Sequence, residues 1–220
     1  MIKPKVFIAC DTTDLNKVKK IIKHTRLTKI KIGYKFGLEF MNTKNGRKFI
    51  SKLKKKIIFI DLKLNDTVNT MLSAVKALKD LKIDYLTVHI SSGLSALKAV
   101  KKVSGSIKII GVTTLTSLNN NDLKLIGYNR SIKNLVTHQA KLAQRAALDA
   151  LVCSPYEVKA VRKVFKKEII TPGVQIGKRN YDQKRSMEAK KVNSDWLVIG
   201  RAITKGNIKK NIQNLTKRLR

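Results

Sequence analysis

The sequence is poor in acidic side chains, cysteine, proline and aromatic rings. Of its 220 residues only 14 are Asp or Glu, whereas 48 are Lys or Arg, so the formal net charge is +34. The two cysteines, Cys10 and Cys153, have no Cys-x-x-Cys spacing, which argues against a disulfide or a thiolate metal site and favours buried thiols. Three prolines provide no Pro-rich linker, and no apolar run approaches the roughly 18 residues that suggest a membrane span.

The excess of positive charge invites a nucleic-acid interpretation, because lysine and arginine neutralise phosphates. The lysines are spread through nearly every predicted helix, however, and aromatic residues make up only 5% of the chain. We therefore interpret the charge as a coding bias that leaves nonspecific attraction to polyanions at low salt, and we expect no specific nucleic-acid partner and no membrane. The beginning of the chain shows no signal-peptide pattern, so we expect a cytoplasmic protein.

Short apolar runs alternate with lysine-rich amphipathic segments along the whole chain. The runs cover residues 5–10, 29–34, 56–62, 84–90, 107–114, 150–154, 168–174 and 195–200. Eight strands that alternate with helices predict a (β/α)₈ barrel, a TIM barrel, and a doubly wound open sheet is the alternative. Because composition does not change along the chain, we expect one domain over residues 1–220.

Three charges follow the third predicted strand within six residues. Asp61 and Lys63 are two positions apart, so in a strand they share one face, and Asp66 follows in the loop. A lysine between two carboxylates is expected to have a raised pKa and to remain a cation that can donate a proton. The alternative is a buried ion triad with a structural role only.

Other strand ends add polar groups that a barrel would bring to one mouth. Asp11 ends the first strand, and we expect Lys31 in the second strand to lie beside Asp61 in an array of alternating charge. In the alternative interpretation Asp11 caps a helix and Lys31 extends to solvent. We interpret His89, at the end of the fourth strand, as a core histidine outside the catalytic set.

Two further strand ends carry groups that suit a polar ligand. The fifth strand ends in a hydroxyl-rich tip, Val112-Thr113-Thr114-Leu115-Thr116-Ser117, which could hydrogen-bond a planar polar ligand or cap the next helix. Gly200 and Arg201 follow the eighth strand, where barrels often hold phosphate, and the loop 175–183 is a candidate lid over an anion.

Taken together these motifs resemble orotidine 5′-phosphate decarboxylases from about Val6 to Thr204. The resemblance is carried by Ala9-Cys10-Asp11, Lys31-Ile32-Gly33, Asp61-Leu62-Lys63-Leu64-Asn65-Asp66, Asn69-Thr70, Leu115-Thr116-Ser117, Thr171-Pro172-Gly173, Asp182-Gln183-Lys184-Arg185 and Gly200-Arg201. It implies a homodimeric barrel without metal or cofactor that converts orotidine 5′-monophosphate to uridine 5′-monophosphate (UMP) and CO₂ in pyrimidine biosynthesis.

The resemblance also implies roles for single residues. Lys63 would protonate C6 and Asp61 would lie against the departing carboxylate. The remaining assignments are Asp11 and Lys31 to the ribose hydroxyls, Asp66 and Thr70 to the partner subunit's site, Thr116 or Ser117 to the pyrimidine, and Gln183, Gly200 and Arg201 to the phosphate. Gln175 stands where the family usually has Arg, and the following loop is shorter than usual, so Lys178 or Arg179 could compensate.

Two rival functions fit parts of the pattern. Sugar-phosphate decarboxylases and hexulose-phosphate synthases resemble the chain at Asp61, Lys63 and Asp66, but carry a magnesium-binding acid where we place Lys31. A basic RNA-binding or regulatory barrel without catalysis is the rival from another class.

Overall fold

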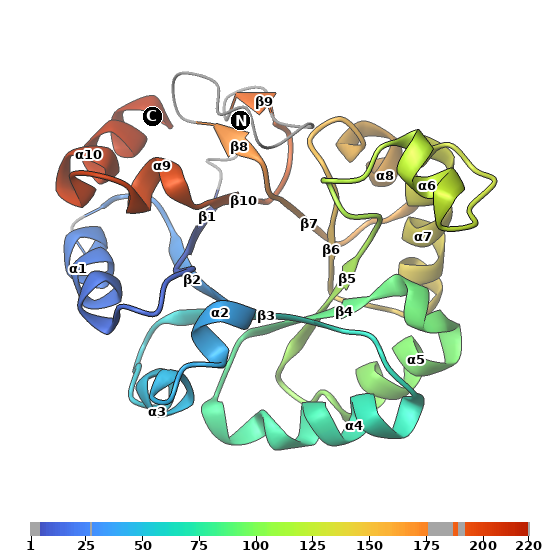
Figure 1. The fold of residues 1–220 in the computed structure, drawn as a ribbon, viewed down its shortest axis with the longest axis horizontal. Coiled ribbons are helices and arrows are strands. Elements are labelled where there is room, and N and C mark those ends of the chain that lie inside the picture. The colour runs from blue at the N-terminus through green and yellow to red at the C-terminus, as the bar shows by residue number, and fades with distance from the viewer. Residues whose placement is uncertain (1–4, 27, 176–186, 189–191, 220) are drawn as a thin grey trace.

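The computed structural model describes residues 5–26, 28–175, 187–188 and 192–219, and it shows a closed barrel surrounded by helices (Figure 1). The barrel strands are parallel: β1 (Lys5–Ala9), β2 (Ile32–Gly37), β3 (Ile57–Leu64), β4 (Tyr85–His89), β5 (Lys108–Val112), β6 (Ala150–Val152), β7 (Glu168–Thr171) and β10 (Trp196–Ile199). Their order around the barrel is β1-β10-β7-β6-β5-β4-β3-β2. The predicted TIM barrel is confirmed, and the open sheet is wrong.

Helices follow the strands and cover the outside of the barrel (Figure 1). They are α1 (Leu15–Thr25), α2 (Leu38–Met41), α3 (Gly46–Ser51), α4 (Val68–Ala77), α5 (Gly93–Val103), α6 (Asn120–Leu125), α7 (Ile132–Arg145), α8 (Val158–Val164), α9 (Arg201–Thr204) and α10 (Ile208–Arg218), with 3₁₀ turns η1 (Lys79–Leu81) and η2 (Ile90–Ser92). A short pair of strands, β8 (Val174–Gln175) and β9 (Met187–Glu188), is separate from the barrel. Among the described residues, no helix is long and apolar enough to cross a membrane.

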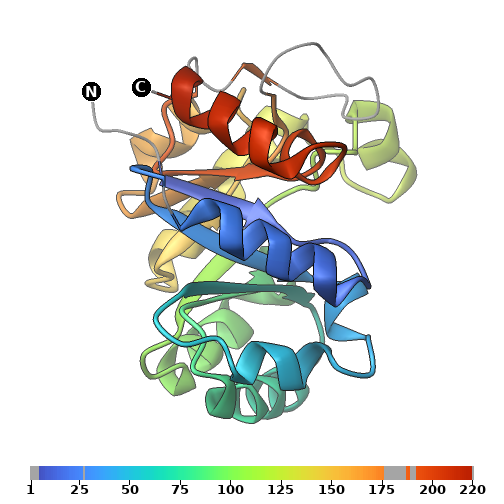
Figure 2. The same cartoon turned by 90° about the vertical axis from the view of Figure 1, so that its left-hand side faces the viewer.

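Helix α1 shows how the lysine-rich segments fold. The Asp14 carboxylate accepts a hydrogen bond from the Asn16 N–H at 2.8 Å and so caps the first turn. Val18, Ile21 and Ile22 recur at three- and four-residue spacing and are buried, while the lysines between them stay outside the core. Figure 2 shows the last helix, α10, packed beside α1, so the two ends of the chain close the ring of helices.

Three pairs of neighbouring strands are joined at their amino-terminal ends, each by an aspartate that directly precedes one strand of the pair. Each carboxylate accepts a hydrogen bond from the backbone N–H of the neighbouring strand. The pairs are Asp84 with Ile58 at 2.7 Å, Asp149 with Ile109 at 2.9 Å and Asp195 with Ile169 at 2.7 Å. These acids fix the strand register at this end of the barrel, which the sequence analysis did not anticipate.

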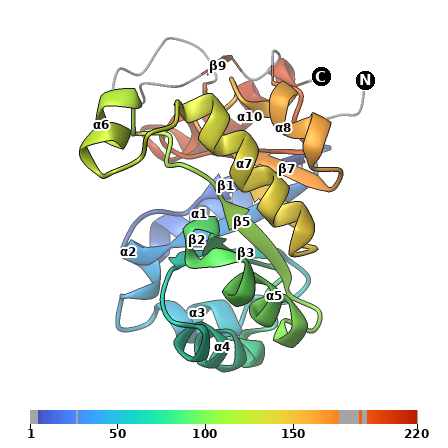
Figure 3. The ribbon, with the colours of Figure 1, turned by 90° about the vertical axis from the view of Figure 1, so that its right-hand side faces the viewer.

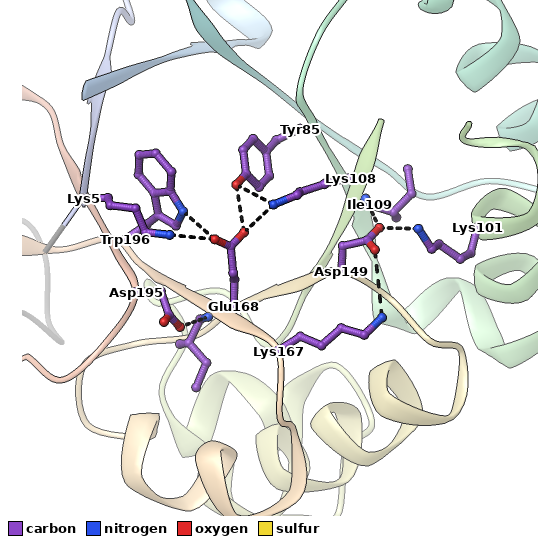
Figure 4. A network of polar contacts seen from close by, with 11 residues as sticks. Lys5, Tyr85, Lys101, Lys108, Ile109, Asp149, Lys167, Glu168, Asp195 and Trp196 are labelled. Atoms are coloured by element: carbon purple, nitrogen blue, oxygen red, sulfur yellow. Dashed lines mark hydrogen bonds and ion pairs between the residues drawn. The ribbon is translucent and has the colours of Figure 1, made fainter. Parts of the chain in front are cut away.

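The same end of the barrel is filled by a polar and aromatic network around Glu168 (Figure 4). Glu168 accepts hydrogen bonds from Lys5 and the Tyr85 hydroxyl at 2.8 Å and from the Trp196 indole at 3.2 Å. The Trp196 ring stacks on Phe7, with ring centroids 4.0 Å apart. Burial would raise the pKa of Glu168, but hydrogen bonds from Lys5 and Tyr85 and the charge of Lys5 lower it to about 2. This network occupies the amino-terminal end, and a TIM barrel is expected to bind its ligand at the other end.

The loops after the strands gather at that other end. Figure 3 shows α2 and α6, which follow β2 and β5, on the same side of the barrel. Strand β2 begins at Ile32, three residues later than predicted, and ends at Gly37. This shift changes which lysine points into the barrel.

Candidate active site

A cavity of about 490 Å³ opens at the carboxyl ends of the strands. Six of the predicted site residues line it: Asp11, Asp61, Lys63, Thr116, Gly200 and Arg201. One wall, from the ends of β1, β2 and β3, carries four charged side chains. The rest of the described lining comes from the ends of β5, β6, β7 and β10 and the segments that follow them, and it consists mostly of small apolar residues and threonines, with Arg201 as its charged member. Such a site places an array of charges opposite a wall of mixed apolar and hydroxyl groups.

The charged wall is an array of alternating sign that runs from β1 to β3. The Lys35 ammonium lies 3.1 Å from an oxygen of Asp11 and 3.1 Å from Oδ2 of Asp61. The Lys63 ammonium lies 2.9 Å from the other Asp61 oxygen, Oδ1. The order Asp11, Lys35, Asp61, Lys63 therefore brings two cations and two anions to one side of the cavity.

The prediction that Lys31 belongs to this array is wrong. Lys31 precedes β2 and is exposed, whereas Lys35 lies within β2 and is buried. The sequence holds two Lys-x-Gly tripeptides four residues apart, Lys31-Ile32-Gly33 and Lys35-Phe36-Gly37, and only the register of the strand distinguishes them. Lys35 pairs with Ala9 on one side and Phe59 on the other, which places it level with the cavity.

Gly37 provides the space that the array needs. A Cβ atom at this position would lie 3.0 Å from an Asp11 oxygen and 3.5 Å from the Lys35 ammonium. Any larger side chain would therefore displace the ion pair between β1 and β2. In the second Lys-x-Gly tripeptide, Lys35 therefore supplies the cation and Gly37 leaves room for its ion pair with Asp11.

Burial and the neighbouring charges shift the pKa values of Lys35 and Asp61 in opposite directions. Burial would lower the pKa of Lys35, but the carboxylates of Asp61 and Asp11 outweigh it, so the pKa is raised. Burial would likewise raise the pKa of Asp61, but the Lys35 and Lys63 ammonium groups lower it. Lys35 is therefore a cation and Asp61 an anion at neutral pH.

Lys63 has one carboxylate partner within the described chain, not the two that the sequence suggested. Asp66 is exposed, and its carboxylate accepts a hydrogen bond from the Thr67 N–H at 2.7 Å at the start of α4. Thr70 is also exposed and lies 3.0 Å from the Thr67 hydroxyl, oxygen to oxygen. Neither Asp66 nor Thr70 is among the described residues that line the cavity.

The hydroxyl-rich tip after β5 lies only partly in the cavity. Thr116 lines it, whereas Ser117 is exposed and is not among the described lining residues. Thr113 and Thr114, which belong to the same predicted hydroxyl-rich tip, also line the cavity and are buried. Gln139 on α7 accepts hydrogen bonds from the Thr114 N–H at 2.8 Å and the Thr114 hydroxyl at 3.1 Å, which anchors this tip.

The expected phosphate end is described in part. Arg201 begins α9 directly after Gly200, and both line the cavity. Gln175 belongs to β8, and only its backbone is described. Gln183 and the loop residues Lys178 and Arg179 lie outside the described residues.

His89 and the cysteines stand apart from the array. His89 is half-buried and is not among the described lining residues. Burial and the nearby Lys63 charge lower its pKa. Cys10 and Cys153 are both buried, as predicted. Within the described residues, no three His, Cys, Asp or Glu side chains gather closely enough to hold a metal ion.

Comparison with known proteins places the chain among enzymes. The model of the orotidine 5′-phosphate decarboxylase / HUMPS family matches residues 4–212. The chain is 41% identical over 212 residues to a protein named orotidine 5′-phosphate decarboxylase from Wolbachia pipientis subsp. Culex pipiens, with 92% of each chain covered. It is 39% identical over 220 residues to a protein of the same name from Wolbachia sp. subsp. Brugia malayi, with 96% of each covered.

A solved structure agrees with these similarities. The crystal structure of orotidine 5′-phosphate decarboxylase from Lactobacillus acidophilus has a TM-score of 0.80 and 27% identity to this chain, and the similarity covers 98% of both chains. The family match extends over nearly the whole barrel, including each strand that contributes to the charged wall. The chain therefore belongs to the orotidine 5′-phosphate decarboxylase / HUMPS family.

Proposed function

We propose that the chain is an orotidine 5′-phosphate decarboxylase, a carboxy-lyase that converts orotidine 5′-monophosphate to UMP and CO₂ in pyrimidine biosynthesis. The observation that carries this proposal is the charged wall, in which the Lys63 ammonium lies 2.9 Å from Asp61 inside the cavity. The names of the relatives support the same reaction.

The proposed chemistry needs a cation where negative charge develops. When the bond between C6 and the carboxylate breaks, the electron pair remains on C6 and CO₂ leaves. The Lys63 ammonium, aimed at C6, would stabilise this charge and then transfer its proton to C6, after which solvent reprotonates the lysine. No metal or cofactor takes part in this scheme.

Asp61 would act on the carboxylate that leaves. Two carboxylates placed close together repel each other in the ground state, and the repulsion falls as CO₂ departs. The lowered pKa of Asp61 supports this role, because a protonated Asp61 would not repel the substrate. Lys35 and Lys63 keep Asp61 in place against that repulsion.

The rest of the cavity would orient the substrate. We propose that Asp11 and Lys35 bind the ribose hydroxyls, with Lys35 in the role that the sequence suggested for Lys31. Thr116 would contact the pyrimidine, while Gly200 and Arg201, with Gln175 and Gln183, would contact the phosphate. Distant contacts of this kind can stabilise the closed state in which the reaction occurs.

We also propose a homodimer with shared sites. Asp66 and Thr70 are exposed at the start of α4, away from the cavity of their own chain, which leaves them available to a second copy. In a twofold dimer each chain would then complete the site of its partner.

The metal-dependent members of the family are the rival, and the position of Lys35 argues against them. Its ammonium lies 3.1 Å from both Asp11 and Asp61, so a protein cation already neutralises the two carboxylates that a divalent ion would need. Activity on orotidine 5′-monophosphate that survives exhaustive chelation supports the proposal. A requirement for added Mg²⁺ favours the rival.

The direct test follows the loss of substrate absorbance with purified protein. Wild-type protein is expected to turn over orotidine 5′-monophosphate, and Lys63→Ala is expected to lose nearly all turnover while its melting temperature stays close to the wild-type value. Lys31→Ala serves as the matched control, because this lysine is exposed and outside the array. A Lys63→Ala variant with near-normal kcat contradicts the proposal.

A further inference from the structure

Thr87 on β4 connects the two groups of β3 to which the chemistry is assigned. Its hydroxyl oxygen accepts a hydrogen bond from the Lys63 backbone N–H at 2.9 Å. The same hydroxyl donates to Oδ1 of Asp61 at 3.1 Å. Thr87 is fully buried and is not among the described residues that line the cavity, so its side chain acts through Asp61 and Lys63.

The backbone of Lys63 explains why such a support is needed. Lys63 has φ of +51°, in the left-handed region that side-chain-bearing residues rarely adopt. The other described non-glycine residues with positive φ, Lys55, Lys82 and Ala147, lie outside strands. A conformation of this kind inside a strand persists only when its surroundings hold it.

The pairing of β3 with β4 shows how Thr87 provides that support. Ile60 pairs with Leu86, and the next pair is Leu64 with Val88. Three residues of β3, Asp61 to Lys63, therefore lie opposite one residue of β4, Thr87. The bulge moves the Lys63 N–H out of the regular ladder, and the Thr87 hydroxyl replaces the missing backbone acceptor.

The direction of the two hydrogen bonds is fixed by the single hydroxyl proton. Because the oxygen accepts from the Lys63 N–H, its single proton is directed to Oδ1 of Asp61, which the Lys35 and Lys63 charges favour as a carboxylate by lowering its pKa. Oδ1 of Asp61 then receives both the Thr87 hydroxyl and the Lys63 ammonium, while Oδ2 faces Lys35. The Thr87 hydroxyl thus holds both the backbone conformation of Lys63 and the orientation of the Asp61 carboxylate.

We propose that Thr87 is a positioning residue for the reaction, which holds the Lys63 ammonium and the Asp61 carboxylate in their productive geometry. This inference rests on the proposed function. Because Thr87 does not touch the cavity, its loss should reduce kcat and leave substrate binding largely intact.

The test compares Thr87→Val, which keeps the shape but removes the hydroxyl, with Thr87→Ser, which keeps the hydroxyl. We expect Thr87→Val to lower kcat by about 10- to 100-fold with KM changed by less than about threefold, and Thr87→Ser to remain within about threefold of wild type. The matched control is Thr171→Val, because Thr171 is also a fully buried barrel threonine but its hydroxyl has no hydrogen-bond partner in the described structure.

Two readouts separate positioning from general stability. The acidic limb of the kcat profile should move to higher pH in Thr87→Val, because Asp61 loses a hydrogen bond that favours its ionised form. The rate at which acetic anhydride modifies Lys63, followed by mass spectrometry, should change in Thr87→Val and stay at the wild-type value in Thr171→Val. If Thr87→Val does not fold, Thr87→Cys replaces it, and an intermediate loss of kcat is expected.

The outcomes distinguish this inference from the proposed function. If wild-type protein has no decarboxylase activity, the proposed function fails, and the modification rate of Lys63 still tests the positioning role. If wild-type protein is active but Thr87→Val matches it in kcat and Lys63 reactivity, the inference is overturned. Equal losses in Thr87→Val and Thr87→Ser, or in Thr87→Val and Thr171→Val, also overturn it.

Discussion

Lys35 joins the two carboxylates that line one wall of the cavity. Its ammonium contacts Asp11 and Asp61, and its side chain is only 11% exposed. Removing one member of a buried ion network leaves its partners uncompensated, which costs more than the network contributes as a whole. The effect of a substitution here should therefore exceed that of any change to the many lysines on the surface.

Lys35→Met is expected to reduce kcat/KM by at least about 100-fold and to lower the free energy of unfolding by about 3 kcal/mol. Unlike the more exposed Lys63, which pairs with Asp61 alone, Lys35 is buried and its loss removes the cation that Asp11 and Asp61 share. Lys31→Met is the control and should stay within about twofold of wild type in kcat/KM, as an exposed change away from special features. Steady-state kinetics and urea unfolding measure both. Equal losses in the two variants would contradict the assignment of Lys35.

At the scale of elements, the sequence predicted that each barrel strand exists but not where each one begins. Alternation of apolar and charged residues around Lys29 to Lys35 fits a strand in more than one register, and the pairing of β2 with β1 and β3 selects the later one. The two Lys-x-Gly tripeptides therefore could not be distinguished from local pattern. Tertiary pairing, which one sequence does not display, decided between them.

The same limit applies to β3 and to the amino-terminal ends of the strands. Alternation placed Asp61 and Lys63 on one face, and the structure brings both to the cavity, but the bulge and the left-handed backbone at Lys63 depend on a residue of β4. The aspartates that precede β4, β6 and β10 resemble ordinary turn residues in sequence. Their contacts to neighbouring strands become visible only when the barrel is closed.

The Glu168 network joins β7 to β1, β4 and β10 and predicts a specific dependence of stability on pH. The pKa of Glu168 is lowered from 4.5 to about 2 in the folded protein. A lowered acid pKa stabilises the fold above the unfolded value, and this contribution is lost as pH falls from about 4.5 to about 2. The shift corresponds to a contribution on the order of 3 kcal/mol at neutral pH.

Urea unfolding at a series of pH values tests this expectation. Wild-type protein should lose stability steeply between about pH 4.5 and pH 2, whereas Glu168→Gln should be less stable at pH 7 and should show a shallower slope over that interval. Asp80→Asn is the control, because its carboxylate is largely exposed and pairs only with Arg47 in the described structure. Identical slopes for wild type and Glu168→Gln would refute the role of this network.

On the scale of the whole molecule, the acidic residues with a structural role and those in the cavity lie at opposite ends of the barrel. Asp84, Asp149, Asp195 and Glu168 lie at the amino-terminal end of the barrel and hold strands together. Asp11 and Asp61 lie at the opposite end, in the cavity. In a chain with a net charge of +34, the few acids thus mark both ends of the barrel. The cytoplasmic location and the absence of a specific nucleic-acid partner stay predictions.

If the sites are shared across a dimer, two inactive variants should restore activity when their chains are mixed. Lys63→Ala and Asp66→Ala are each expected to be nearly inactive as pure proteins. In a heterodimer, one of the two sites would combine an intact Lys63 from one chain with an intact Asp66 from the other. Random exchange of subunits in an equal mixture should therefore restore about a quarter of the wild-type activity, since half of the dimers are mixed and each has one complete site.

The complementation experiment needs a control for the assembly itself. Lys63→Ala mixed with the double variant Lys63→Ala/Asp66→Ala forms dimers without any complete site, so it should remain inactive. Differently tagged chains purified in tandem verify that heterodimers have formed. Because Asp66 is exposed and outside the cavity of its own chain, activity in the first mixture alone requires that the residue act across the interface. Verified heterodimers without activity would mean that each chain builds its site alone, and Asp66 would then be left with its observed hydrogen bond to the Thr67 N–H at the start of α4.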